Sequence, residues 1–136
     1  MSVIANLITG GVCHRFPDLK FVSVESGVGW LPFALEHLDW QWLNCGVPQE
    51  HPEYDLLPSE YFKRQCLISA EPDESITAAV AQHLGPEYVI WASDYPHLDA
   101  SFNVVGQIRE KIAGLPESAQ RKILGENAVR FYGLSA

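Results

Sequence analysis

Basic side chains are scarce in this sequence of 136 residues. Nine lysines and arginines stand against 17 aspartates and glutamates, which gives a formal net charge of -8. That charge disfavours attraction to phosphate backbones and to anionic membranes, so we expect neither nucleic acid nor a membrane as a partner. The sequence also lacks a signal-peptide pattern and an apolar run near the roughly 20 residues of a membrane span. A cytoplasmic location is therefore the expectation.

Cysteine and histidine patterns that hold metals or disulfides are also missing. Cys13, Cys45 and Cys66 are far apart and form no CxxC pair. Their odd number and spacing argue against a disulfide framework or a zinc knuckle and favour buried, reduced thiols. The five histidines show no HxH or HExxH spacing, so local pairs cannot build a complete zinc site. The chain contains no GxSxG motif, phosphate-binding loop or dinucleotide fingerprint.

The patterns that are present predict one α/β domain over residues 1–136 with 47% hydrophobic content. We predict an initial helix over residues 2–14 and then three strand-then-helix units, with strands within 19–25, 61–70 and 88–91. The proline-containing stretch 44–60 is predicted to be irregular. Such alternation is typical of a parallel sheet with helices packed outside. Three strands cannot close a barrel of eight, so the sheet is open, incomplete or completed by another chain.

The third predicted strand leads to the most informative carboxylate, Asp94. Apolar residues without polar alternation favour a strand buried on both faces, and functional groups gather at the carboxyl ends of parallel strands. Asp94 could bind a divalent metal or move a proton, although a helix cap or a turn former is the alternative. Pro96 stiffens the following turn, so His97 can point into the same cleft as a substrate contact, with Tyr95 beside it.

Glu25 has the analogous place at the end of the first predicted strand. Gly27 and Gly29 follow it and leave room for a ligand or water. Glu25 could face Asp94 across a cleft, where two carboxylates would share acid–base work or metal ligation. A solvated glutamate at a strand end is the alternative.

Several short motifs follow one another in an order that resembles a known family. They are FPDLKF at 16–21, ESGVGWLP at 25–32, PSEYF at 58–62, SDYPH at 93–97 and ILGENA at 123–128. Together they resemble the amidohydrolase-related metal-dependent hydrolases, whose relatives include aminocarboxymuconate semialdehyde decarboxylase and other non-oxidative decarboxylases. Members of that family are (β/α)8 barrels more than twice as long. The resemblance implies that this chain corresponds to their carboxyl-terminal part, an incomplete TIM barrel of about three parallel strands with outer helices.

The resemblance also implies a metal site. In the family an HxH pair, a mid-barrel histidine and a last-strand aspartate surround a divalent cation, and only the aspartate has a counterpart here, Asp94. It would bind the metal, with zinc expected first and manganese second, and could take a proton from the attacking water. The decarboxylase branch has a histidine with glycines where this chain has Glu25, a departure that favours hydrolysis. The isolated chain, lacking the other ligands, could also hold no metal.

Three functional hypotheses follow. The first is metal-dependent hydrolysis of a small carboxylate- or amide-type substrate, with Asp94 and Glu25 catalytic, Asp94 the metal ligand, and His97 and Tyr95 in contact with the substrate. The second is non-oxidative decarboxylation by the same family of sites. The third is a non-catalytic fragment that acts as an interaction or subunit module. The expected protein partner is a second copy of the chain, in a homo-oligomer, or a complementing barrel half, because the exposed edge strands of an open sheet can pair with another chain.

Overall fold

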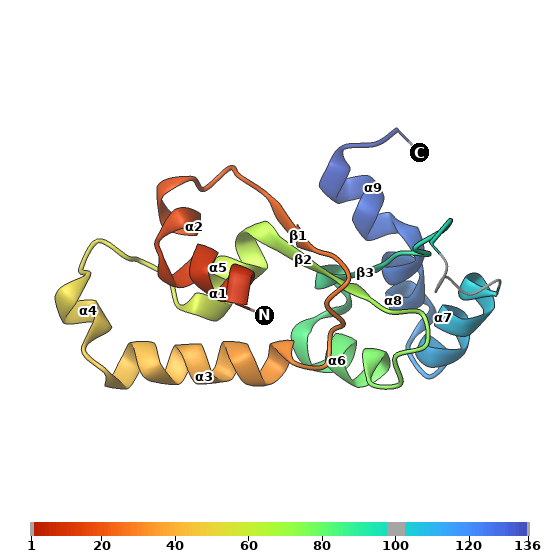
Figure 1. The fold of residues 1–136 in the computed structure, drawn as a ribbon, viewed down its shortest axis with the longest axis horizontal. Coiled ribbons are helices and arrows are strands. Elements are labelled where there is room, and N and C mark those ends of the chain that lie inside the picture. Colours follow the sequence, from red (N-terminus) through yellow and green to blue (C-terminus); the bar gives the residue numbers. More distant parts are fainter. Residues whose placement is uncertain (1, 98–102, 136) are drawn as a thin grey trace. The chain divides into compact units, whose positions relative to one another are not determined.

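The strands form one three-stranded sheet in the order β1-β2-β3 (Figure 1). The computed structural model describes residues 2–97 and 103–135, and the strands are β1 (Phe21–Ser23), β2 (Cys66–Ala70) and β3 (Val89–Trp91). β2 pairs with β3 in parallel, with Ile68 opposite Val89 and Ala70 opposite Trp91. All five residues of β2 are buried, as expected for a central strand covered on both faces. The predicted parallel α/β sheet is confirmed.

Helices precede and connect the strands (Figure 1). The described residues form α1 (Ser2–Thr9), α2 (Val12–Arg15), α3 (Leu31–Asn44), α4 (Val47–Glu50), α5 (Pro58–Gln65), α6 (Thr77–Leu84), the 3-10 turn η1 (Pro86–Tyr88), α7 (Val104–Ile112), α8 (Glu117–Arg121), the π-helical turn η2 (Lys122–Glu126) and α9 (Asn127–Tyr132). The helix predicted over residues 2–14 is divided in two at Gly11, whose φ of 72° is left-handed. Glycine adopts that conformation without a steric penalty, so the chain turns there.

The chain forms two compact units, which we describe separately. Unit 1 contains residues 1–23 and 30–67, and unit 2 contains residues 24–29 and 68–136. The assignment of residues 1–136 to a single domain stays a prediction. Among the described residues, no helix is both long enough and apolar enough to span a membrane.

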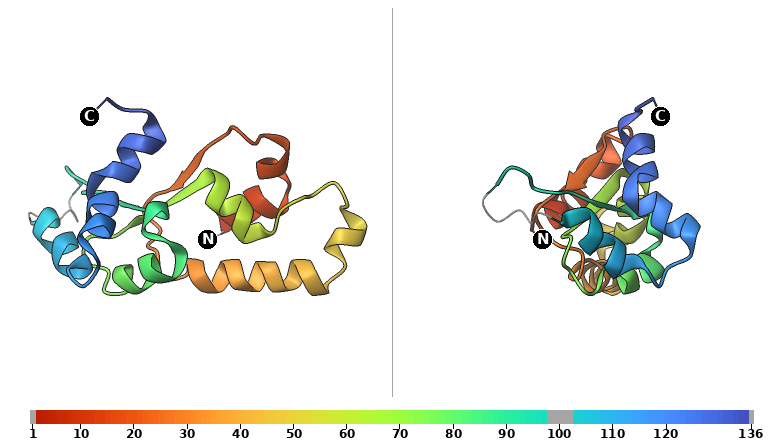
Figure 2. Two further views of the ribbon diagram at one scale, coloured as in Figure 1. Left: turned by 180° about the vertical axis from the view of Figure 1, so that it is seen from behind. Right: turned by 90° about the vertical axis from the view of Figure 1, so that its right-hand side faces the viewer.

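In unit 1, α3 packs against α5 and α4, and α1 contacts α2 and α5. The long α3 and the neighbouring α1 and α5 can be followed in the left view of Figure 2. The Gln65 side chain is only 2% exposed. Its Nε2 donates to the carbonyl oxygens of Phe16 and Leu19, at 2.7 Å each. These bonds hold the link that leads from α2 into β1.

The strand predicted within residues 61–70 is present as β2, which begins at Cys66, whereas residues 61–65 belong to α5. Pro58 starts this helix at a position where a missing N–H is tolerated. The Glu60 carboxylate accepts a hydrogen bond of 2.8 Å from the backbone N–H of Leu57, which satisfies a free donor at the helix start. Residues 44–60 also contain α4, so the segment predicted to be irregular is partly helical.

The cysteines agree only in part with the prediction of buried thiols. Cys13 and Cys66 are buried, whereas Cys45 is exposed, and all three are free. Burial raises the pKa of the Cys66 thiol to about 12. Cys66 is therefore a protonated core side chain at neutral pH.

In unit 2, side-chain hydrogen bonds fix the ends of β3. Asn127, 1% exposed, donates to the carbonyl oxygens of Pro86 at 2.7 Å and Val89 at 2.8 Å. Trp91 Nε1 donates to the carbonyl oxygen of Leu124 at 3.4 Å. Because both η2 and α9 also pack against β3, the segment that follows the strand starts from a well-held position.

Candidate functional site

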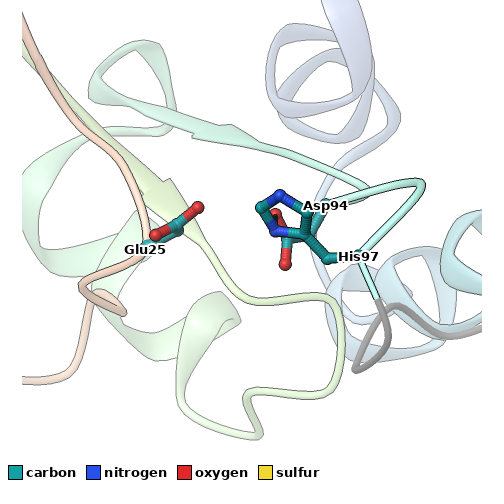
Figure 3. A group of neighbouring side chains, drawn as sticks. All are labelled: Glu25, Asp94 and His97. Carbon is teal, nitrogen blue, oxygen red and sulfur yellow. Dashed lines mark ion pairs between the residues drawn. The ribbon is translucent and has the colours of Figure 1, made fainter.

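Three side chains that can bind a metal come together in unit 2: Glu25, Asp94 and His97 (Figure 3). One ligand atom from each lies within 4.8 Å of the other two. Glu25 comes from the segment after β1, and Asp94 and His97 come from the segment after β3 (Figure 3). We call these residues the carboxylate–histidine cluster.

The positions of the strands explain this meeting. Glu25 follows the last residue of β1 by two positions, and Asp94 follows the last residue of β3 by three. The carboxyl ends of parallel strands lie at one edge of a sheet, so residues just beyond them converge. The structure thus brings Glu25 and Asp94 together, as the sequence suggested, while their catalytic roles stay predictions.

Asp94 and His97 form the tightest contact of the cluster. Nδ1 of His97 lies 2.9 Å from Oδ1 of Asp94, and the backbone N–H of His97 donates to the Asp94 carbonyl oxygen at 2.8 Å. An ionised carboxylate can only accept, so Nδ1 carries the hydrogen and Nε2 is left to meet a ligand or a proton. The side chains are 31% exposed for Asp94 and 65% for His97, which leaves the pair accessible.

The backbone is strained at both carboxylates. Glu25 and Asp94 each have φ of 55°, and they are the two non-glycine residues with positive φ in the described part of the chain. The left-handed conformation is unfavourable for most residues with a Cβ atom, and more so for glutamate than for aspartate, and such strain gathers at functional sites. Both strained residues belong to one three-residue cluster, so the strain singles out this place in the fold.

The surroundings of the cluster are acidic. Burial raises the pKa of the Glu71 carboxyl above its usual range, and the negative charges of Glu74 and Asp94 add to that rise. A cation near these carboxylates would relieve their repulsion. Two carboxylates and one imidazole are also donors that zinc and manganese accept, so the side chains present fit a divalent cation.

Tyr95 differs from the other predicted site residues. Its side chain is 80% exposed, and its backbone N–H bonds to Oγ of Ser93 at 3.3 Å. Its role as a substrate contact stays a prediction. Sequence reasoning placed His97 beside a substrate and did not include it among the ligands, although its spacing of three residues from Asp94 indicated a shared turn.

Comparison with known proteins gives one family. The family model described as Amidohydrolase matches residues 1–134. The comparison with curated proteins gives no match.

Solved structures with similar folds are much longer than this chain. An amidohydrolase from Mycobacterium avium subsp. paratuberculosis K-10 has 25% identity and a TM-score of 0.76, over 94% of this chain and 32% of that one. The 5-carboxyvanillate decarboxylase of Sphingomonas paucimobilis has 32% identity and a TM-score of 0.75, over 95% and 38%. The apo form of Metarhizium anisopliae IDCase shares the fold at 20% identity, with a TM-score of 0.72 over 94% and 37%. The chain therefore spans about a third of the length of these structures, as expected for part of a barrel.

Proposed function

Because the chain belongs to the amidohydrolase family, we propose that its carboxylate–histidine cluster binds a divalent cation and serves metal-dependent hydrolysis of a small carboxylate- or amide-type substrate. The observation that carries this proposal is the left-handed backbone at both Glu25 and Asp94, beside His97. Strained residues persist where a function needs their side chains in place. Zinc is the first candidate cation and manganese the second.

The three residues have distinct chemical abilities. A bound divalent cation lowers the pKa of a water molecule and polarises a carbonyl oxygen. Asp94 holds the Nδ1 proton of His97, an arrangement that orients the ring and makes Nε2 a better electron-pair donor. Glu25 and Asp94 each provide a carboxylate that can accept a proton from an attacking water.

Decarboxylation is the second candidate reaction. It is favoured by the 32% identity to a 5-carboxyvanillate decarboxylase over 95% of this chain. In that reaction carbon dioxide leaves and the carbon that carried it takes a proton from solvent, which Asp94 or His97 could relay. Glu25, where the decarboxylase branch has a histidine, favours hydrolysis. Since the chain spans about a third of its structural relatives, both reactions are proposed for a complete barrel that contains this part.

Metal binding is the direct test. We expect Mn²⁺, titrated into the full chain in a calorimeter, to bind at one site. Asp94→Asn should weaken binding by about 10-fold or more, because it alters a ligand and even the loss of an outer group that orients a ligand costs about 10- to 100-fold. Asparagine tolerates the left-handed backbone, so the variant keeps the local shape. Asp73→Asn is the matched control because Asp73 is exposed and outside the cluster. Equal Mn²⁺ affinity in the wild type and Asp94→Asn would refute the proposal.

Product analysis separates the reactions. The chain loaded with Mn²⁺ would be incubated with 5-carboxyvanillate and, separately, with small amides. Release of carbon dioxide supports decarboxylation, and a new carboxylic acid from an amide supports hydrolysis. Metal binding without either product would favour a subunit that needs a complementing barrel half.

The remaining predictions concern partners and location. A homo-oligomer or a complementing barrel half stays a prediction, and a monomer in size-exclusion chromatography with light scattering would count against the homo-oligomer. A cytoplasmic location is likewise proposed and is tested by cell fractionation.

A further inference from the structure

Consecutive backbone amides after β1 are held by two carboxylates from the turn after β2. The N–H of Val28 lies 2.9 Å from both Oε1 and Oε2 of Glu74, and the N–H of Gly29 donates to Oε1 at 2.9 Å. The N–H of Gly27 donates to the carboxylate of Glu71. All these residues belong to unit 2. Hydrogen bonds to an ionised acceptor are stronger than neutral ones, so Glu74 is a firm anchor for this loop.

The glycines make this close approach feasible. A Cβ atom at Gly27, where φ is 61°, would lie 3.0 Å from Oε1 of Glu74. A Cβ atom at Gly29 would lie 3.2 Å from Cγ2 of Ile76 and 3.4 Å from the same Glu74 oxygen. Side chains at these positions would push the carboxylate away from the amides. The sequence suggested that Gly27 and Gly29 leave room for a ligand or water beside Glu25. In the structure the Glu74 carboxylate occupies the space next to these glycines.

The held loop begins next to a strained residue. Glu25 has its φ of 55° only three residues before Val28, whose side chain is completely buried. An unfavourable backbone conformation persists only where the surrounding structure determines it. On the carboxyl side of Glu25, the contacts that hold the loop include the buried Val28 side chain, the amide bonds to Glu74 and the bond from Gly27 to Glu71.

We propose that Glu74 is a positioning residue for the carboxylate–histidine cluster: by accepting the Val28 and Gly29 amides it fixes the loop that presents Glu25 to Asp94 and His97. This inference rests on the proposed metal-binding function. Glu74 itself touches neither the substrate nor the reacting atoms in this role. It acts through the backbone, in the way that outer groups orient the ligands of metal sites.

A variant series separates positioning from simple charge. Glu74→Ala removes every acceptor, whereas Glu74→Gln removes the charge and keeps one oxygen, which can still serve Val28 and Gly29 as Oε1 does now. Asp73→Asn removes one charge from the same turn and is the control. For positioning we expect Mn²⁺ affinity to fall about 10-fold or more in Glu74→Ala, to recover largely in Glu74→Gln and to stay unchanged in Asp73→Asn. Equal losses in Glu74→Ala, Glu74→Gln and Asp73→Asn would mean that charge alone acts, and would overturn the proposal.

A second measurement does not need the metal. Amide hydrogen exchange at Val28 and Gly29 should be about 10-fold faster or more in Glu74→Ala than in the wild type, and the backbone carbon shifts of Glu25 should leave their left-handed values. Glu74→Gln should stay close to the wild type in both measurements. Unchanged exchange and unchanged Glu25 shifts in Glu74→Ala would overturn the positioning role. If the wild type binds no Mn²⁺ while these changes occur, the proposed metal function fails and the positioning of Glu25 stands.

Discussion

Replacing Glu25 by glycine and by alanine tests the strain that singles out the cluster. Both variants remove the carboxylate and its repulsion with Asp94, so those effects cancel when the two variants are compared. They differ in the backbone: alanine keeps a Cβ atom at φ of 55°, and glycine does not. The comparison therefore isolates the conformational free energy at position 25.

The expected sign follows from two opposing terms. The left-handed conformation costs a residue with a Cβ atom roughly 1–2 kcal/mol. Glycine loses more chain entropy on folding, a cost of roughly 0.5–1 kcal/mol relative to alanine. The difference leaves Glu25→Gly more stable than Glu25→Ala by up to about 1.5 kcal/mol, with a central value of about 0.7 kcal/mol. At a position with ordinary φ the order is reversed, because alanine is then the more stable by about 0.4–1 kcal/mol.

The free energy of unfolding of each variant is measured by urea denaturation followed by tryptophan fluorescence. The dependence of that free energy on urea concentration should be the same in all variants. The same pair of substitutions at the neighbouring Val24 is the control. Val24 is 51% exposed, and among the described non-glycine residues positive φ occurs only at Glu25 and Asp94. We expect alanine to be the more stable at position 24 and glycine at position 25. The same order at both positions, with alanine the more stable, would refute the strain argument.

Further predictions concern packing and charge. Gly11→Ala should lower the free energy of unfolding by about 2 kcal/mol or more, because φ is 72° and the new Cβ would collide with the Tyr54 hydroxyl, as chemical denaturation can show. Gln65→Leu should lower it by about 2–3 kcal/mol in the same assay, because two backbone carbonyls lose their donor. The pKa of Glu71 is raised above 4.5, chiefly by burial, so the folded state binds more protons and stability should fall as pH rises from 4.5 through the folded pKa. Glu71→Gln keeps an acceptor for the Gly27 N–H and should reduce the decrease in stability with rising pH. If the urea midpoint of Glu71→Gln depends on pH as that of the wild type does, the decrease does not come from Glu71.

The strand ends were predictable from the sequence because their signals are local. A buried apolar run that stops at Asp94 predicts a strand and a functional carboxylate, and the structure has β3 followed by Asp94. The spacing of Asp94 and His97 also indicated a shared turn. In the structure Nδ1 of His97 lies 2.9 Å from Oδ1 of Asp94.

Other features depend on contacts distant in sequence and could not be read in advance. The start of the strand within residues 61–70 could not be located because residues 61–65 lead without interruption into β2, yet α5 forms there because Pro58 and Glu60 satisfy its start. Glu74 bonds to amides 45 and 46 residues away, and no local pattern predicts that pairing. The one available signal was a loop of glycines with few polar side chains of its own, whose amides need acceptors from elsewhere.

The residues at the left-handed positions of the loop 24–29 bear on the proposed role of Glu25. Gly27 occupies the other left-handed position of this loop, at φ of 61°, so the loop follows the usual preference two residues away. Glutamate at position 25 goes against that preference, whereas aspartate at position 94 is one of the few residues with a Cβ atom that adopt this conformation regularly. If position 25 only formed a turn, glycine would be the more stable residue there, because it has no Cβ atom and avoids the steric cost of the left-handed backbone. Glu25 lies within reach of Asp94 and His97, so the strained backbone at Glu25 agrees with the proposal that its carboxylate serves this cluster.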